Sequence, residues 1–497
     1  MLFNSLQFLL FFPAVTAVYF LLPHRVRYLW LLGTSYYFYM CWNPKYALLM
    51  GTSTLITFVS GLLIDRSNRL EDKARGTRQK KLWVALSFTS NLAILYFFKY
   101  FDFSVANINA VLGLFNVAQL RPGFDVLLPV GISFYTFHAL SYTMDVYRGE
   151  MRAEHNVAKY ALFVSYFPQM VAGPIARSKQ LLVQMSDRHT FEWPRVRDGL
   201  LLMLWGYFLK LVIADRVALL VNQVYNDYTA YSGASLVVAT VFFAIQIYCD
   251  FASYSLLAIG SAQVMGFRLV ENFNTPYFAR SIGEFWRRWH MSLSTWFRDY
   301  LYIPLGGNRK GRWRKYFNVM LVFLVSGFWH GAAWTYIIWG GLNGGYQVVG
   351  EITKPLRDRL LAFLRVNRES LGHKLLQTLI SFVLICVAWV FFRANSLHDA
   401  VGIFRRIATQ FQPWTLFDGT LLRLGLDLPD FMVVVFSVMV LTAVSICKYN
   451  NIRLRALYTQ QDLWFRWTAV LAAIFLILIF GVYGPGYSAA AFIYFQF

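Results

Sequence analysis

Apolar segments of about twenty residues recur along the whole chain, and this repetition constrains the fold more than any other feature of the sequence. The candidate spans are residues 5–22, 28–42, 45–64, 82–101, 126–147, 157–175, 199–222, 233–266, 316–349, 375–393, 431–448 and 465–483. Some are short and others are long enough to be bent pairs, so we expect about 10–12 crossings of a bilayer. Backbone groups in lipid must be satisfied within the segment, which makes the spans helices. The sequence predicts an all-α integral membrane protein.

The composition supports a membrane protein rather than a soluble one. Of the 497 residues, 58% are apolar and only 14% are charged, whereas soluble domains carry about 25% charged residues. No internal repeat, low-complexity linker or soluble segment separates the apolar stretches. We therefore expect a single polytopic domain over residues 1–497.

The net charge of +21 is concentrated in short connections between the apolar segments. The most basic connections are residues 66–81, 280–315 and 354–374. Short loops rich in Lys and Arg lie in the cytoplasm, where they face anionic lipid headgroups. This distribution argues against a nucleic-acid partner, since no nucleic-acid-binding fold accompanies it. It would suit an anionic cytosolic substrate such as an acyl-coenzyme A.

The segment 268–315 differs from its surroundings because aromatic residues alternate with Arg and several Pro and Gly residues interrupt it. It cannot span a bilayer as a simple lipid-facing helix. Phe285, Trp289 and Trp296 have a spacing that suits one face of a helix. The pattern predicts amphipathic or re-entrant helices on the cytoplasmic side.

Three of the eight histidines lie in apolar or aromatic surroundings, and the others fall in polar connections or at span edges. His330 has no charged residue near it, and an ionisable group there is costly unless it is paired or lines a hydrated cavity. The residues alone leave open whether His330 acts on a substrate or packs between helices. For His138 they favour a hydrogen-bonded core histidine, and for His290 a histidine at the membrane interface. Neither the histidines nor the four scattered cysteines have metal-ligand spacing, so we expect no metal site.

A neutral imidazole is the side chain best suited to remove a proton from an alcohol near pH 7. Acyl transfer from a thioester to a hydroxyl needs such a base and stabilisation of the developing oxyanion. It needs neither a metal nor a covalent enzyme intermediate. The chain has no nucleophile elbow, Walker loop or metalloprotease motif, which is compatible with so small a site.

Several long motifs resemble the membrane-bound O-acyltransferase family, in particular its bacterial branch that includes the membrane subunit of alginate O-acetylation. The matching stretches are FPQMVAGPIARSKQL at 167–181, IYCDFASYSLLAIGSAQVMGF at 247–267, NFNTPYFARSIGEFWRRWHMSLSTWFRDYLYIPLGGNRKG at 272–311 and FLVSGFWHGAAWTYIIWGGLNG at 323–344. The C-terminal FIYFQF is also similar to this branch. The resemblance runs through most of the chain and is strongest at about 165–350.

The resemblance implies a helical bundle around a central pore, in which the histidine of the FWHG motif, His330, is catalytic. It implies that His290, in the RRWH motif, borders the same chamber. Trp329 and Asp250 are expected to give structural or polar support. The family commonly has a second acidic residue shortly after the position of Asp250, and this chain has Leu256 there. Any role that this acid has in other members is therefore in doubt for this chain.

The expected function is transfer of an acetyl group from a cytosolic thioester, acetyl-coenzyme A, to a hydroxyl acceptor across a bacterial inner membrane. Arg287, Arg288, Arg298 and Arg309 are candidates for binding the phosphates of the donor, because Arg has forked donors. Anchoring to membrane lipids is an equal alternative for each Arg. The acetyl group would reach a polysaccharide directly or through a periplasmic SGNH-type partner. No permanently bound cofactor is expected.

Three other functions remain open from the sequence. One is export of D-alanyl groups from a carrier protein to teichoic acids, another is acyl transfer to lipid or protein from a long-chain donor, and the last is a non-enzymatic proton-coupled transporter. An intramembrane histidine can serve as a proton relay, although transporters more often show inverted repeats with interrupted helices. The sequence shows neither feature.

Overall fold

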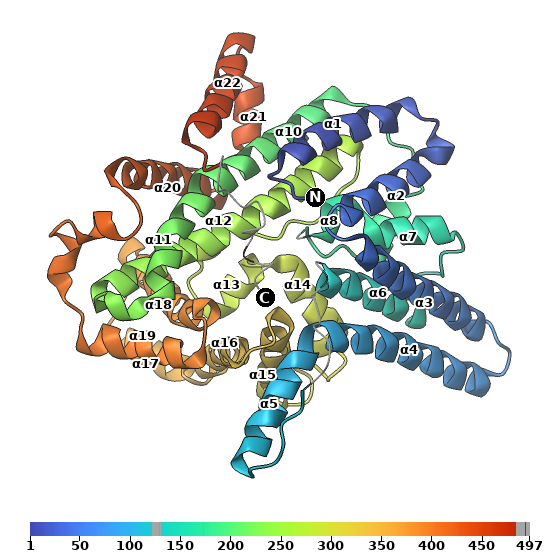
Figure 1. Cartoon of the computed structure of the whole chain (residues 1–497), viewed down its shortest axis with the longest axis horizontal. Helices are drawn as coiled ribbons and strands as arrows, with labels where there is room; N and C mark the ends of the chain where they lie inside the picture. Colours follow the sequence, from blue (N-terminus) through green and yellow to red (C-terminus); the bar gives the residue numbers. More distant parts are fainter. Residues whose placement is uncertain (122–128, 130, 172, 484–492, 494–497) are drawn as a thin grey trace. The chain divides into compact units, whose positions relative to one another are not determined.

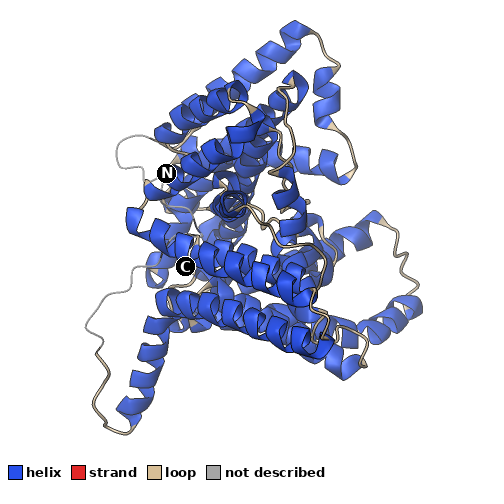
Figure 2. Ribbon diagram, turned by 90° about the vertical axis from the view of Figure 1, so that its right-hand side faces the viewer, coloured by secondary structure: helices blue, strands red, loops and turns tan. Residues whose placement is uncertain are grey.

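The computed structural model describes all residues except 122–128, 130, 172, 484–492 and 494–497. The start of the expected span 126–147 and most of the C-terminal FIYFQF motif therefore lie outside the described residues. The described part of the chain contains helices and no strands (Figure 2), which confirms the all-α prediction.

Contacts divide the chain into two compact units, whose helices are labelled in Figure 1. Unit 1 comprises Met1–Met203 and Leu257–Val270, and unit 2 comprises Leu204–Leu256 and Glu271–Phe497. Two of the three boundaries fall within helices, α10 (Trp193–Tyr207) and α12 (Gly233–Met265), and the third follows α12. The expectation of one domain stays a prediction.

Unit 1 consists of helices joined by short connections. These are α1 (Leu6–Leu21), α2 (His24–Met40), α3 (Pro44–Asn68), α4 (Lys73–Leu95), a π-helical turn (Tyr96–Tyr100), α5 (Phe101–Leu114), α6 (Ile132–Tyr147), α7 (Val157–Ser165), α8 (Phe167–Met170) and α9 (Ser178–Gln184). The side chains of Asn43 and Asp72 cap α3 and α4 by accepting hydrogen bonds from backbone N–H groups of their first turns. Helix α3 packs against α4 and α6.

Unit 2 contains the remaining helices. They are a π-helical segment (Phe208–Ala214), α11 (Asp215–Asn226), α13 (Ile282–Arg288), α14 (Met291–Phe297), a π-helical turn (Arg298–Tyr302), α15 (Arg312–His330), α16 (Trp334–Ile352), α17 (Lys354–Phe363), α18 (Leu371–Arg393), α19 (Leu397–Thr409), α20 (Leu428–Tyr449), α21 (Leu454–Thr459) and α22 (Leu463–Phe480). Four short 3₁₀ turns, at Tyr228–Ala230, Pro276–Phe278, Pro413–Leu416 and Thr420–Arg423, lie between them.

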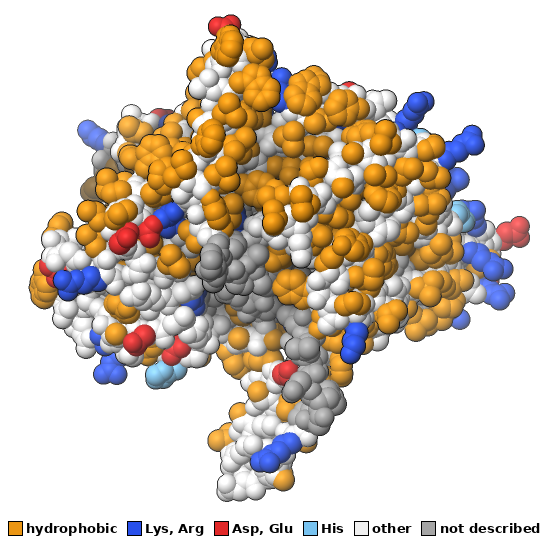
Figure 3. Space-filling view, turned by 45° about the horizontal axis from the view of Figure 1, so that its top comes forward, with side chains coloured by type: hydrophobic (Ala, Val, Ile, Leu, Met, Phe, Trp, Pro, Cys, Tyr) orange, Lys and Arg blue, Asp and Glu red, His pale blue; other side chains and the backbone are white. Residues whose placement is uncertain are grey.

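Within the described residues, six helical segments are long and apolar enough to cross a membrane. They are Pro44–Asn68, Lys73–Leu114, Gly233–Met265, Leu371–Arg393, Leu428–Tyr449 and Leu463–Phe480. In α22 only Ile477 is buried, and hydrophobic side chains cover much of the face shown in Figure 3. The chain is a multi-pass membrane protein. The expected count of about 10–12 crossings and the central pore stay predictions, because further apolar helices such as α1 are shorter.

The expected span 316–349 is two antiparallel helices, α15 and α16, that pack closely along glycines. A Cβ atom at Gly327 would lie 2.3 Å from the carbonyl oxygen of Tyr336, and one at Gly340 would lie 2.3 Å from that of Phe323. Small residues allow this approach of two backbones in membrane proteins. At the other end of the pair, Lys315 Nζ lies 2.6 Å from Glu351 Oε1. The pair therefore has a charged end, where α15 begins at Arg312, and an apolar tip, where His330 lies.

We predict that Gly340→Ala destabilises the protein by roughly 1–3 kcal/mol, because the added methyl group forces α15 and α16 apart. Gly345→Ala is the matched control: it lies on the same helix with no heavy atom within 4 Å of the new Cβ. It should be neutral or slightly stabilising, since Ala favours helix over Gly. Thermal unfolding in detergent measures both, and equal destabilisation by the two variants would contradict the packing argument.

Candidate active site

His330 is the last residue of α15, and one hydrogen bond fixes its orientation. Its Nδ1 lies 2.6 Å from the carbonyl oxygen of Ser326, one turn earlier. A carbonyl oxygen can only accept, so Nδ1 carries the proton in the neutral ring and Nε2 holds the basic lone pair. The ring is 4% exposed. The helix end therefore presents an imidazole in the tautomer that a general base requires.

Aromatic side chains surround the His330 ring. The centroids of Trp329 and Trp339 both lie 4.8 Å from it, and that of Phe392 lies 5.8 Å away. Trp389 stacks on Trp339 at 5.9 Å. We call Trp329, Trp339, Trp389 and Phe392 the aromatic cluster. Such surroundings exclude water from the His330 ring.

His290 lies at a break between α13 and α14, where its φ of 42° is unusual for a residue with a side chain. Backbone hydrogen bonds hold the break, because Met291 N–H donates to the carbonyl oxygen of Asn272 at 2.9 Å. Asn272 is itself fixed by Ser255 and Ser292 through buried side-chain hydrogen bonds of 2.8 and 2.6 Å. The prediction that Phe285, Trp289 and Trp296 share one face of a single helix is wrong, since the chain turns at His290 and Trp296 belongs to α14.

The structure brings His290, Trp329 and His330 together. The His290 ring is 6.4 Å from that of Trp329, which is 4.8 Å from that of His330. The two imidazoles also interact electrostatically. His290 is buried and packs against Phe251 with ring centroids 4.6 Å apart. The arrangement is one oriented base with a second imidazole beside it in a mostly apolar environment.

Asp250 lies in a buried charged group that the sequence analysis did not foresee. Lys210 Nζ lies 2.6 Å from Asp250 Oδ1 and 2.7 Å from Asp215 Oδ1, and all three side chains are buried. The second oxygen of Asp250 accepts a hydrogen bond of 2.8 Å from the backbone N–H of Ile493. Asp250 thus supports the fold of unit 2 and holds one residue of the C-terminal segment. The signal for Lys210 was its place as a lone cation in the apolar run WGYFLKLVIA.

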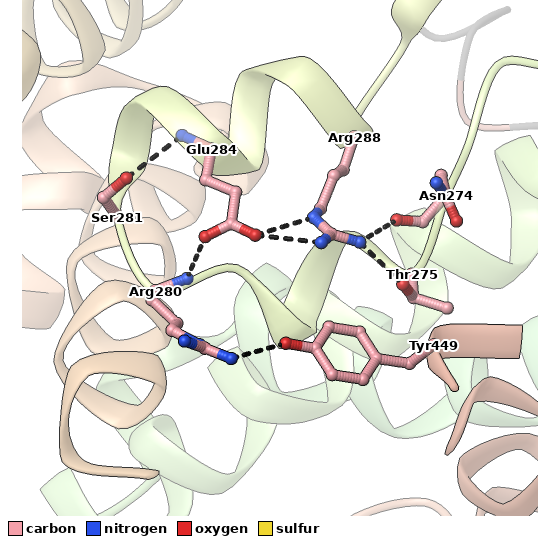
Figure 4. Close-up of polar contacts among 7 residues, drawn as sticks. All are labelled: Asn274, Thr275, Arg280, Ser281, Glu284, Arg288 and Tyr449. Carbon is pink, nitrogen blue, oxygen red and sulfur yellow. Dashed lines mark hydrogen bonds and ion pairs between the residues drawn. The ribbon is translucent and has the colours of Figure 1, made fainter. Parts of the chain in front are cut away.

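Arg288 is held by its neighbours (Figure 4). Its guanidinium donates to Glu284 Oε1 at 3.0 and 2.9 Å, and to the carbonyl oxygen of Asn274 and the hydroxyl of Thr275. The same Glu284 accepts a hydrogen bond from the backbone N–H of Arg280. This network fixes the segment that leads into α13.

The other three predicted arginines are exposed. Arg298 donates to Asp299 at 2.7 Å, and this hydrogen bond raises the pKa of Arg298 above its usual value. The side chains of Arg287 and Arg309 make no hydrogen bond or ion pair with the described residues. They remain able to bind an anion, whereas Arg288 is already occupied.

Other histidines and a polar pocket belong to unit 1, whereas the His330 site belongs to unit 2. His138 is buried in α6 of unit 1, as expected of a core histidine, but neither ring nitrogen has a hydrogen-bond partner among the described residues. A small pocket in unit 1, lined by His24, Arg27 and His189 among others, contains none of the predicted site residues. Within the part of the chain that the structure describes, no group of three or more His, Cys, Asp or Glu could hold a metal ion.

The sequence model of the membrane-bound O-acyltransferase family matches residues 86–392, which include both histidines and the aromatic cluster. The chain belongs to this family. It is therefore an O-acyltransferase of the membrane, and the His330 site is its candidate active site.

Named relatives of this O-acyltransferase act on different polymers. The chain is 38% identical to the probable alginate O-acetylase of Azotobacter vinelandii over 84% of its own length and 80% of that protein. It is 33% identical to the peptidoglycan O-acetyltransferase of Helicobacter pylori, over 82% and 79% of the two chains. It is 26% identical to the teichoic acid D-alanyltransferase of Bacillus subtilis, over 56% and 72%.

We predict that Lys210→Met destabilises this O-acyltransferase by about 3–5 kcal/mol, because two buried carboxylates lose their cation. Lys354→Met, which removes an exposed lysine, is the control. The yield of folded protein and its thermal unfolding measure the effect. Adding Asp250→Asn to Lys210→Met should restore part of the loss, and no recovery would contradict the charge argument.

We predict that the adjacent arginines of the RRWH motif differ in role. Arg288→Gln should destabilise the protein by roughly 1–2 kcal/mol, since charge-assisted hydrogen bonds to Glu284 are lost. Arg287→Gln should leave the unfolding temperature unchanged, because it breaks no contact. Parallel unfolding curves test this, and identical behaviour of the two variants would show that the network in Figure 4 contributes nothing.

Proposed function

We propose that this enzyme transfers an acetyl group from acetyl-coenzyme A to a hydroxyl group for O-acetylation of an exopolysaccharide at a bacterial inner membrane. The observation that carries the proposal is the hydrogen bond from His330 Nδ1 to the carbonyl of Ser326. It leaves Nε2 available as the general base in a water-poor, aromatic environment, and the reaction requires such a base.

The proposed step is a direct transfer. His330 Nε2 takes the proton of the acceptor hydroxyl while its oxygen attacks the thioester carbonyl. The tetrahedral intermediate collapses, the carbon–sulfur bond breaks, and the imidazolium returns its proton to the leaving thiolate. The products are an O-acetyl ester and a free thiol, and the enzyme is unchanged. His290 adjoins the site as a second imidazole that can donate to the developing oxyanion.

The donor is expected to approach from the basic end of α15. This end begins at Arg312 and is preceded by Arg309, and the helix of 19 residues is about 28 Å long. Positively charged connections mark the cytoplasmic side, where acyl-coenzyme A is found. The side chains of Arg287 and Arg309, which have no partner among the described residues, are the best candidates for its phosphates.

The relatives favour acetyl transfer over D-alanyl transfer. Proteins named as acetylating enzymes align over 82% and 84% of this chain, whereas the teichoic acid D-alanyltransferase aligns over 56%. We propose that the acetyl group then reaches the polymer, either directly or through a periplasmic partner protein.

We predict that His330→Ala lowers acetyl transfer at least about 10²-fold, since a positioned general base contributes roughly 10²–10⁴-fold. His398→Ala is the control, because that side chain is 89% exposed on α19. Polysaccharide O-acetylation is measured with labelled acetyl-coenzyme A in membranes containing equal amounts of each variant. Retained acetyl transfer by His330→Ala would reject the assignment of His330 as the base. If the unaltered protein moved protons across the membrane but cleaved no thioester, the result would favour a proton-coupled transporter.

A further inference from the structure

Trp339 carries a buried hydrogen-bond donor beside the candidate base. Its side chain is 1% exposed, and its indole Nε1–H has no acceptor among the described residues. An indole nitrogen can only donate, so the group is satisfied only when another molecule supplies an acceptor atom. Buried donors of this kind are rare in folded proteins, and each one calls for an explanation.

The fold holds this indole close to His330. The centroid of the Trp339 ring lies 4.8 Å from that of the imidazole, and the two ring planes meet at 68°. The next residue, Gly340, packs against the backbone of Phe323, which fixes Trp339 relative to the helix that ends at His330. Trp389 stacks on the indole at 5.9 Å. The ring is therefore held in place by its neighbours, with the N–H group on its edge.

A neighbouring indole shows how such a donor is usually satisfied. Trp286 is also buried, and its ring centroid lies 5.6 Å from that of Trp339. Its Nε1–H donates to Asn343 Oδ1 at 3.1 Å, and Asn343 Nδ2 donates in turn to the backbone carbonyl of Trp339 at 2.8 Å. Asn343 is thus used by one indole and by the backbone of the other. Of these two adjacent indoles, only Trp339 keeps its N–H available for a ligand.

Acyl transfer creates an acceptor that this donor could serve. When the acceptor hydroxyl attacks the acyl carbon, an electron pair of the carbonyl double bond moves onto the carbonyl oxygen, which becomes an oxyanion. In a site from which water is excluded, this charge must be stabilised by donors that are already in position. A neutral N–H group in an apolar environment stabilises the charge more strongly than it would in water.

We propose that Trp339 is a catalytic residue whose indole N–H donates a hydrogen bond to the oxyanion of the tetrahedral intermediate. This inference rests on the proposed function and deepens it, because it adds to the base a residue that stabilises the charge formed during attack. No proton leaves the indole. When the intermediate collapses, the electron pair returns to the carbonyl, the carbon–sulfur bond breaks, and the imidazolium gives its proton to the thiolate.

The test removes the N–H group and keeps the ring. In the full-length protein, Trp339 is replaced by the tryptophan analogue in which a sulfur atom takes the place of the N–H group. Acetyl transfer from acetyl-coenzyme A to a polysaccharide is measured in lipid nanodiscs. We expect kcat to fall roughly 10²-fold, the usual cost of losing one oxyanion donor. KM should stay unchanged, because the hydrogen bond forms in the transition state and not in the ground state.

The same analogue at Trp286 is the matched control. There it removes an N–H group that has a partner, so Asn343 Oδ1 loses its donor and the unfolding temperature should fall while kcat is maintained. At Trp339 the unfolding temperature should stay the same or rise, because the lost donor has no acceptor within the described part of the chain. The two variants are therefore expected to show opposite effects on stability and on rate.

An unchanged kcat in the Trp339 variant would overturn the proposal. A lower unfolding temperature with a normal kcat would show that the N–H group instead contacts the face of a neighbouring ring. A loss of rate that lies wholly in KM would assign the indole to substrate binding and would also reject the oxyanion role.

His330→Ala separates this inference from the proposed function. Normal transfer by His330→Ala would reject the base but leave the oxyanion donor standing, since any acyl transfer to a hydroxyl forms the same kind of intermediate. If the enzyme cleaves a D-alanyl thioester and not acetyl-coenzyme A, the proposed donor is wrong. The Trp339 variant should then show the same fall in kcat with the D-alanyl thioester, and a normal kcat with it would reject the oxyanion role.

Discussion

The close approach of α15 and α16 at Gly327 and Gly340 is the constraint on which the candidate site depends. The chain reverses within three residues after His330, and it can do so because no side chain separates the two backbones there. The ring of Tyr336 fills the space beside Gly331, where a Cβ atom would lie 2.1 Å from it. His330 is consequently held at the tip of a helical pair rather than along its side. Its hydrogen bond to Ser326 then sets which nitrogen is basic.

Burial of polar groups in unit 2 follows two patterns. The positive charge of Lys210 is paired with the negative charges of two aspartates. A buried charge in a low-dielectric interior requires such a partner of opposite sign. His330 instead donates to a backbone carbonyl and lies among aromatic rings. Buried charges that are paired with one another stabilise the fold. A buried base that is not paired with a charged group can still act on another molecule. The distinction separates Asp250 from His330, although both are buried polar residues of strong family motifs.

The sequence predicted the class of fold well. Long apolar segments require helices, and the FWHG and RRWH motifs contain the two histidines that the structure brings together. It failed where a tertiary contact decides. The periodicity of Phe285, Trp289 and Trp296 favours one helix, but hydrogen bonds to Asn272, which precedes α13, hold His290 in a conformation that ends it. Periodicity also could not distinguish Arg287 from Arg288. Arg288 is held by hydrogen bonds to Glu284, whereas Arg287 is exposed.

The aromatic cluster also explains how a thioester at this site would be protected from hydrolysis. Water competes with any acceptor hydroxyl for the base, and it is present at far higher concentration in an open cleft. Rings of Trp329, Trp339 and Phe392 around His330 exclude that water. An acceptor hydroxyl can enter between the rings because the rest of the acceptor contributes binding free energy. A single water molecule has no such additional binding free energy. Recognition of the acceptor at a distance from the base therefore allows transfer to outpace hydrolysis.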